Sequence, residues 1–180
     1  MAGTAEVVTS MDKLPGITYQ VLVPNEKGLE SVISLLATHP DKPPIDEIAV
    51  FTATTDAFSM ANTNVTVADS LKRLERVVRG ARDKGIKVRG YVSVVITCPY
   101  SGNVDYKRVR DVTKELLDMG CYEVSLGDTT GTGNPASVEE MLSVALGANP
   151  IEKLAGHVRS PITYLSLKLK TPRICRISVP

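Results

Sequence analysis

The chain has 180 residues, of which 43% are hydrophobic and 23% charged, and its formal net charge is +1. These totals are typical of one globular domain. The near-neutral charge argues against bulk electrostatic binding of nucleic acid or anionic lipid, and no apolar run approaches the roughly 20 residues of a membrane-spanning helix. Three widely spaced cysteines predict a reducing compartment. The first eleven residues lack Arg and Lys, so we expect no targeting peptide in this chain.

Apolar runs and helical periodicities alternate along the chain. In order, the pattern predicts strand 17–23, helix 26–37, strand 47–52, helix 67–84, strand 88–96, helix 105–119, strand 123–126, helix 137–146 and a strand beginning at 153. Strands that alternate with helices predict a parallel sheet with right-handed crossovers. The strands are continuously apolar, as expected where both sheet faces are covered. The fold class is therefore α/β.

Helix starts carry recognisable capping residues. Asn25 is the expected N-cap of the first helix, and Thr66 with Asp69 resembles a capping box for the second. Ser137 with Glu140 has the capping-box spacing and predicts the start of the last helix.

The composition changes after His157. Residues 158–180 contain no acidic residue and five basic ones, and no helix signal follows the apolar run 164–169. We therefore divide the chain into a repeating domain, residues 1–157, and an atypical basic tail, residues 158–180. An edge strand followed by a basic end is the alternative.

Polar side chains follow every predicted strand. In parallel α/β folds, ligands bind at the carboxyl ends of the strands. Each such residue also has a structural interpretation, as a helix cap or a core or surface residue. The residues are Asn25, Thr52, Thr54, Ser93, Thr97, Asp128, Thr129 and His157.

The glycine-rich loop 127–133 matches neither the Walker A motif nor the dinucleotide fingerprint. Asp128 would also repel a phosphate, so a metal-linked or substrate-hydroxyl role fits it better. Cys98 has no histidine near it in sequence, and we interpret it as a structural thiol; a nucleophilic role is the alternative.

Several strings, in order, carry a family resemblance. They are Leu14-Pro15-Gly16-Ile17, Leu22-Val23-Pro24-Asn25, Val88-Arg89-Gly90-Tyr91-Val92-Ser93, Cys98-Pro99-Tyr100 and Met119-Gly120-Cys121-Tyr122-Glu123-Val124-Ser125-Leu126-Gly127-Asp128-Thr129. Over residues 1–157 the chain resembles hydroxymethylglutaryl-CoA lyases, within the metal-dependent TIM-barrel lyases and carboxyltransferases. The resemblance implies a partial (β/α)8 barrel, with strands three to six and the start of strand seven, followed by a tail foreign to the family.

The same resemblance implies a function: cleavage of 3-hydroxy-3-methylglutaryl-CoA to acetoacetate and acetyl-CoA, as in leucine degradation and ketone-body formation. It implies a divalent cation, Mg²⁺ or Mn²⁺, with His157 as a metal ligand. It implies a CoA thioester as substrate, no nucleic acid or membrane partner, and a homo-oligomer as one assembly. The implied location is mitochondrial, with peroxisomal and cytosolic alternatives. The implied substrate-pocket residues are Asn25, Arg89, Tyr91, Ser93, Asp128 and Thr129.

The chain also departs from the family pattern. Arg159 stands where the family has the second histidine of a metal-binding pair, and the motifs of the family's first, second and eighth strands are absent from the sequence. We therefore identify no catalytic residue and expect this chain, truncated relative to the family, to be catalytically incomplete. Two alternatives remain: an inactive fragment or pseudoenzyme that acts by binding, and a flavodoxin-like binder of nucleotides or phosphate.

Overall fold

The computed structural model describes residues 3–157 and 177–178. The helices are α1 (Thr4–Ser10), α2 (Glu26–Ala37), α3 (Asp56–Thr63), α4 (Val67–Asp83), α5 (Tyr106–Met119), α6 (Pro135–Leu146) and the 3-10 turn η1 (Ile151–Lys153). The strands are β1 (Gln20–Leu22), β2 (Glu47–Ala53), β3 (Lys87–Ser93), β4 (Thr97–Cys98), β5 (Gly102–Asn103), β6 (Glu123–Gly127), β7 (Leu154–His157) and β8 (Ile177–Ser178). Among these residues, no helix combines the length and apolar character needed to cross a membrane.

The main sheet has the order β1-β2-β3-β6-β7-β8, and every pairing in it is parallel. A second, antiparallel sheet consists of β4 and β5 alone. The parallel sheet confirms the predicted α/β class. Since neighbouring parallel strands run in one direction, their carboxyl ends meet at a common edge of the sheet, where ligand sites of such folds lie.

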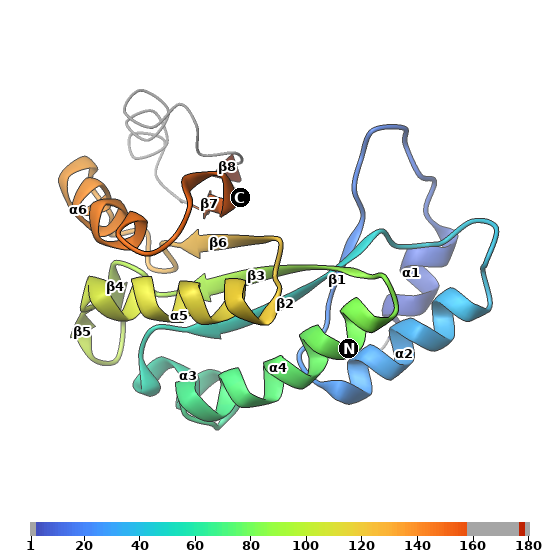
Figure 1. Ribbon diagram of the computed structural model, residues 1–180, viewed down its shortest axis with the longest axis horizontal. Helices are drawn as coiled ribbons and strands as arrows, with labels where there is room; N and C mark the ends of the chain where they lie inside the picture. The colour runs from blue at the N-terminus through green and yellow to red at the C-terminus, as the bar shows by residue number, and fades with distance from the viewer. Residues whose placement is uncertain (1–2, 158–176, 179–180) are drawn as a thin grey trace.

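The helices α2, α4 and α5 follow one another along the sheet (Figure 1), and α6 packs beside α5. The core lies between this helical layer and the strands. Ile48 and Val50 of β2, Val78 of α4 and Leu116 of α5 are completely buried in it. Burial of such side chains contributes about 1.5–3 kcal/mol each, and this contact fixes the helices against the sheet.

Helix starts agree with the sequence in two cases and differ in a third. Asn25 Oδ1 accepts the Gly28 N–H at 3.0 Å, and Thr66 Oγ1 accepts the Asp69 N–H at 3.1 Å. The prediction that Ser137 begins α6 was wrong. Asn134 is the N-cap, and Ser137 is the residue three positions later that completes the capping box. Pro135, which is well suited to a first helical turn, lies between them.

The third strand was predicted too long. It was expected to reach residue 96, but β3 ends at Ser93 because Val94 has the left-handed conformation, with φ 55°. The chain then forms the β4–β5 hairpin, which was not predicted because the apolar run 88–96 indicates one continuous strand. Helices α1 and α3 were also missed. Both are short, and their apolar periodicity covers too few turns to be recognised.

The tail is described only at β8, which pairs in parallel with β7. The predicted strand 164–169 lies outside the described residues, and the domain boundary after residue 157 stays a prediction.

Candidate functional site

On one face of the sheet, every second residue of β2, β3, β6 and β7 lies in register with residues of the neighbouring strands. Phe51, Tyr91 and Ser125 are in register across β2, β3 and β6, and one level further along Gly127 pairs with His157. In-register residues of parallel strands point to the same side, and successive residues alternate. These residues therefore share a face, and it is the one opposite the apolar residues packed on the helices.

A cavity of about 610 Å³ lies over the carboxyl-terminal part of this face. Its volume is within the range of ordinary small-molecule sites. It contains hydroxyl groups, one imidazole and one carboxylate, which can orient a polar substrate by hydrogen bonds. The lining residues are Leu22, Phe51, Asn62, Tyr91, Val92, Ser93, Ser125, Gly127, Asp128, Thr129 and His157.

Asp128 lies on the wall of this cavity and is only 1% exposed. Its Oδ1 accepts the Gly131 N–H at 3.1 Å, and its Oδ2 accepts the Gly133 N–H at 2.9 Å. A Cβ on Gly133 would lie 2.8 Å from Oδ2, which explains the glycine at this position. The carboxylate therefore shapes the loop after β6.

Thr129 and His157 are joined to the same strand ends. Thr129 Oγ1 accepts the Val94 N–H at 2.9 Å, which ties the loop after β6 to the end of β3. The His157 carbonyl accepts the Asp128 N–H at 3.0 Å, which ties the same loop to β7. The three strand ends are thus held together by direct hydrogen bonds around the cavity.

Two of the expected pocket residues lie elsewhere. Asn25 caps α2 and lines a separate hollow of about 510 Å³ between α1 and α2. Arg89 precedes Ser93 by four positions on β3, so their Cα atoms are about 13 Å apart along the strand. Neither residue lines the cavity that contains His157, and a pocket role for them stays a prediction. The family motifs could not distinguish these two residues from those that line the cavity, because a sequence motif assigns residues to a strand but not to one end of it.

Arg89 belongs to a buried ionic cluster near the amino ends of the strands. Its Nη2 lies 2.8 Å from Glu123 Oε1 and its Nε 3.7 Å from Glu47 Oε1. Its Nε also donates to the Tyr122 hydroxyl at 3.1 Å, which in turn donates to Glu47 Oε2 at 2.7 Å. Burial acts to lower the pKa of Arg89, but hydrogen bonds with Tyr122 and Tyr91 and the charge of Glu123 raise it overall. The cluster is a structural unit with a permanently charged centre.

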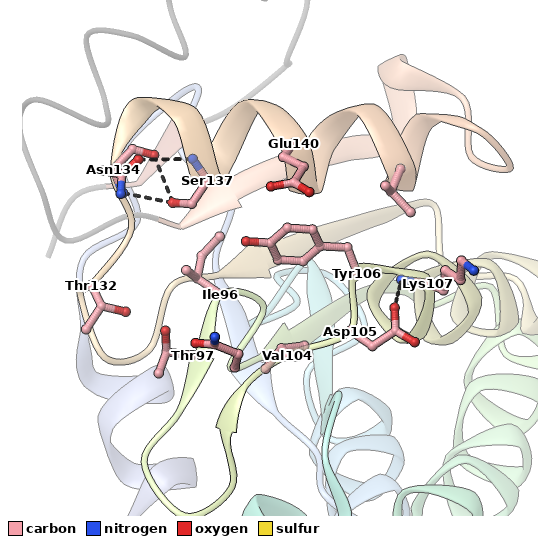
Figure 2. Close-up of a pocket in the computed structure, with 12 residues that line it drawn as sticks. Ile96, Thr97, Val104, Asp105, Tyr106, Lys107, Thr132, Asn134, Ser137 and Glu140 are labelled. Atoms are coloured by element: carbon pink, nitrogen blue, oxygen red, sulfur yellow. Dashed lines mark hydrogen bonds between the residues drawn. The ribbon is translucent and has the colours of Figure 1, made fainter.

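A second cavity, of about 580 Å³, lies between the β4–β5 hairpin and the starts of α5 and α6. Figure 2 shows Tyr106 beneath Glu140, and the hydrogen bonds of Asn134 at the start of α6. Burial, with the charge of Glu140 in addition, raises the pKa of Tyr106. Asp105 and Asn134 already accept backbone N–H groups at the two helix starts. This cavity therefore offers an anion less than a bare helix terminus would.

The comparisons with known proteins identify the family of this chain. Residues 16–155 match the HMGL-like family. The chain belongs to this family. It is 43% identical over 157 residues to the mitochondrial hydroxymethylglutaryl-CoA lyase of Bos taurus, covering 87% of this chain and 46% of that protein. It is also 43% identical over 157 residues to the cytoplasmic 3-hydroxy-3-methylglutaryl-CoA lyase of Rattus norvegicus, covering 87% of this chain and 43% of that protein.

A solved structure agrees with this assignment. The HMG-CoA lyase of Brucella melitensis superposes with a TM-score of 0.89 and 38% identity, covering 99% of this chain and 62% of that one. This match confirms the fold as part of an HMG-CoA lyase barrel, as the sequence predicted. The HMGL-like chain spans about half the length of the curated relatives it matches.

Four of the six expected pocket residues come together in this HMGL-like cavity: Tyr91, Ser93, Asp128 and Thr129, beside His157. Ser125 and Asn62 also line the cavity and were not among the predicted residues. Ser125 could have been found, since it precedes Gly127 by two positions and therefore shares its face. Asn62 could not, because α3 was not predicted.

The sequence predicts a divalent cation with His157 as a ligand, and the described residues can be compared with known metal sites. Catalytic zinc sites use three protein ligands, and magnesium sites use carboxylate oxygens with waters and substrate. Among residues 3–157 and 177–178, no group of three or more His, Cys, Asp or Glu side chains is placed to hold a metal ion. Both Asp128 oxygens already accept backbone N–H groups. The described residues therefore do not form a complete metal site.

Cys98 lies in β4, outside the cavity, with 1% of its surface exposed. Thr55 Oγ1 donates to its Sγ at 3.2 Å. Burial alone would raise the pKa of Cys98, but hydrogen bonds from Ser101, Thr55 and the backbone of Tyr100 outweigh it and lower the pKa to about 7. Burial raises the pKa of the second described thiol, Cys121, to about 12, although the charge of Arg82 opposes this.

We expect this difference to be visible in a titration of the Cys175→Ser variant, in which Cys98 and Cys121 are the remaining cysteines. Thiolate absorbance should show one group ionising near pH 7, and this step should vanish on further replacement by Cys98→Ser. Because the pKa of Cys98 in the folded state is below its ordinary 9.0, ionisation of the thiol stabilises the folded state. This contribution to the free energy of unfolding is absent below about pH 7 and complete above about pH 9. A single step near pH 9 would contradict the prediction.

Proposed function

We propose that this protein is a hydroxymethylglutaryl-CoA lyase chain whose described residues form the substrate-binding part of the site. The observation that carries the proposal is the cavity at the carboxyl ends of β3, β6 and β7, within a chain 43% identical over 157 residues to named lyases. The reaction would cleave 3-hydroxy-3-methylglutaryl-CoA into acetoacetate and acetyl-CoA. By the same likeness, we place the protein in mitochondria, with the cytosol and peroxisomes as alternatives.

The chemistry is a retro-aldol cleavage. A base removes the proton of the tertiary hydroxyl, the C–C bond breaks as the ketone of acetoacetate forms, and the electron pair remains on acetyl-CoA as an enolate that is then protonated. The pocket roles proposed for Tyr91, Ser93, Asp128 and Thr129 are to bind and orient the acyl part and to shape the wall around it. His157 is the proposed metal ligand.

A divalent cation, Mg²⁺ or Mn²⁺, is part of the proposal, and it would supply positive charge for the substrate oxygens and the enolate. His157 contributes one candidate ligand, and the described residues do not complete the set. We therefore propose that the 180-residue chain binds the CoA thioester but does not turn it over alone. Assembly of a ligand set from two copies of the chain, each contributing its own residues, is the alternative.

The test is to measure both binding and cleavage with the purified chain. Calorimetry would report binding of 3-hydroxy-3-methylglutaryl-CoA, and acetyl-CoA release would be followed with Mg²⁺ or Mn²⁺, with a chelator as the control. Binding without release is the expected result. Metal-dependent release would show that a full ligand set is assembled, and its dependence on protein concentration would test for an oligomer. Folded protein that neither binds nor cleaves the thioester would refute the lyase proposal.

The second candidate function is a binding protein without catalysis, a fragment or pseudoenzyme. Arg159 in place of a second histidine, together with the incomplete ligand set, favours it. It shares the expected binding result. The candidates separate when Arg159→His is made: a lyase site that already contributes His157 should gain metal affinity, measured by calorimetry with Mn²⁺, whereas a pure binding module should not.

A further inference from the structure

Val94 is a buried residue in an unfavourable backbone conformation. It is fully buried, and its φ of 55° places a β-branched side chain in the left-handed region. Such a conformation is energetically unfavourable and persists only where the surroundings impose it. The other non-glycine residue with positive φ among the described residues is Asn64, which ends α3 at a position where asparagine is common.

Two threonine hydroxyls hold the backbone of Val94 from opposite strands. Thr54, at the end of β2 and 2% exposed, donates from Oγ1 to the Val94 carbonyl at 2.8 Å. Thr129, after β6, accepts the Val94 N–H on its own Oγ1 at 2.9 Å. Both peptide groups that flank the Val94 Cα are therefore fixed. We call Thr54, Val94 and Thr129 the threonine clamp.

The threonine clamp lies at the wall of the candidate site. It follows Ser93, which lines the cavity, and Thr129 is itself a lining residue. Two backbone contacts accompany it: the Thr54 N–H donates to the Ser93 carbonyl at 3.3 Å, and the Val95 N–H donates to the Gly127 carbonyl at 3.2 Å. The left-handed turn at Val94 takes the chain out of β3 and toward the β4–β5 hairpin, so the cavity is bounded at this level by Ser93.

We propose that Thr54 is a positioning residue of the site, which acts by holding Val94 left-handed so that Ser93 and Thr129 keep their places around the cavity. This role rests on the proposed function only for the identity of the ligand, the CoA thioester. Its physical content is local: without the Thr54 hydroxyl, Val94 relaxes toward negative φ and the end of β3 shifts. A glycine at position 94 tolerates positive φ at little cost and removes the need for the hydroxyl.

Four variants test the threonine clamp: Thr54→Val, which removes the hydroxyl and keeps the shape; Thr54→Ser, which keeps the hydroxyl; Val94→Gly; and the double variant Thr54→Val/Val94→Gly. Binding of 3-hydroxy-3-methylglutaryl-CoA is measured on folded protein. We expect Thr54→Val to weaken binding about tenfold, the factor to which the free energy of one buried hydrogen bond corresponds when its loss falls entirely on the bound conformation. Thr54→Ser should bind like the wild type, and the double variant should regain most of the affinity.

Two results would overturn the positioning role: unchanged binding in Thr54→Val, or weakened binding that Val94→Gly does not restore. Amide hydrogen exchange at residue 94 is measured on the same samples and requires no ligand. It should accelerate about tenfold or more in Thr54→Val and return toward the Val94→Gly rate in the double variant. If the wild type does not bind the thioester but the exchange rates change as expected, the lyase proposal is rejected and the threonine clamp is retained. If exchange at residue 94 is unchanged in Thr54→Val, the threonine clamp itself is rejected.

Discussion

Replacing Arg89 by methionine should lower the free energy of unfolding by about 3–5 kcal/mol, the usual cost of removing one partner from a buried ionic cluster. The guanidinium lies between two carboxylates, Glu47 and Glu123, whose residues are 3% and 4% exposed. Methionine fills much of the volume but supplies no charge and no donor, so both carboxylates would lose their buried counter-charge. Urea denaturation of the wild type and the variant would measure the loss.

The control for this prediction is Lys114→Met, which breaks the exposed pair between Lys114 and Asp118. An exposed pair contributes little, so the change should stay within about 0.5 kcal/mol. A triple variant, Arg89→Met with Glu47→Leu and Glu123→Leu, should recover much of the loss, because no uncompensated charge remains. If Arg89→Met proves as stable as the wild type, or if the triple variant is no better than the single one, the cluster is not held by charge compensation.

Asp128→Ala should destabilise the protein by about 3 kcal/mol and abolish binding of the CoA thioester, because hydrogen bonds to a charged group contribute about 1.5–3 kcal/mol each. The variant removes the acceptor of the Gly131 and Gly133 N–H groups. Since the loop that these bonds hold forms a wall of the cavity, binding should fall further than stability alone would explain. Denaturation and calorimetry on the same preparation would show both effects.

Asp128→Asn serves as the intermediate variant, since an amide keeps one acceptor oxygen and turns a donor toward the other N–H group. It should lose about half as much stability as Asp128→Ala, within the factor of two that such contributions vary. The matched control is Asp118→Asn on the exposed surface of α5, which should leave stability and binding unchanged within about 0.5 kcal/mol. Full binding by folded Asp128→Ala would show that the loop keeps its shape by other contacts.

Whether an expected pocket residue lines the cavity depends on how far it lies from the carboxyl end of its strand. Tyr91, Ser93 and His157 lie on strands whose apolar character is evident in the sequence, and the structure places all three at one cavity. Arg89 is on the same face of β3 as Tyr91 and Ser93 but belongs to the ionic cluster at the other end. Alternation along a strand predicts the face of a residue, but its neighbours depend on strands far away in the sequence.

The sequence by itself determined the α/β class, the main strands and helices, the caps at Asn25 and Thr66, and the membership of the family, because these depend on local periodicity and on ordered strings. The tertiary structure alone decided the end of β3 at Val94. It results from hydrogen bonds between strand ends that meet only in the folded sheet: Thr54 and Thr129 come from 40 residues before and 35 residues after Val94. Local propensity favours extending an apolar run such as 88–96, and two buried hydroxyls override it.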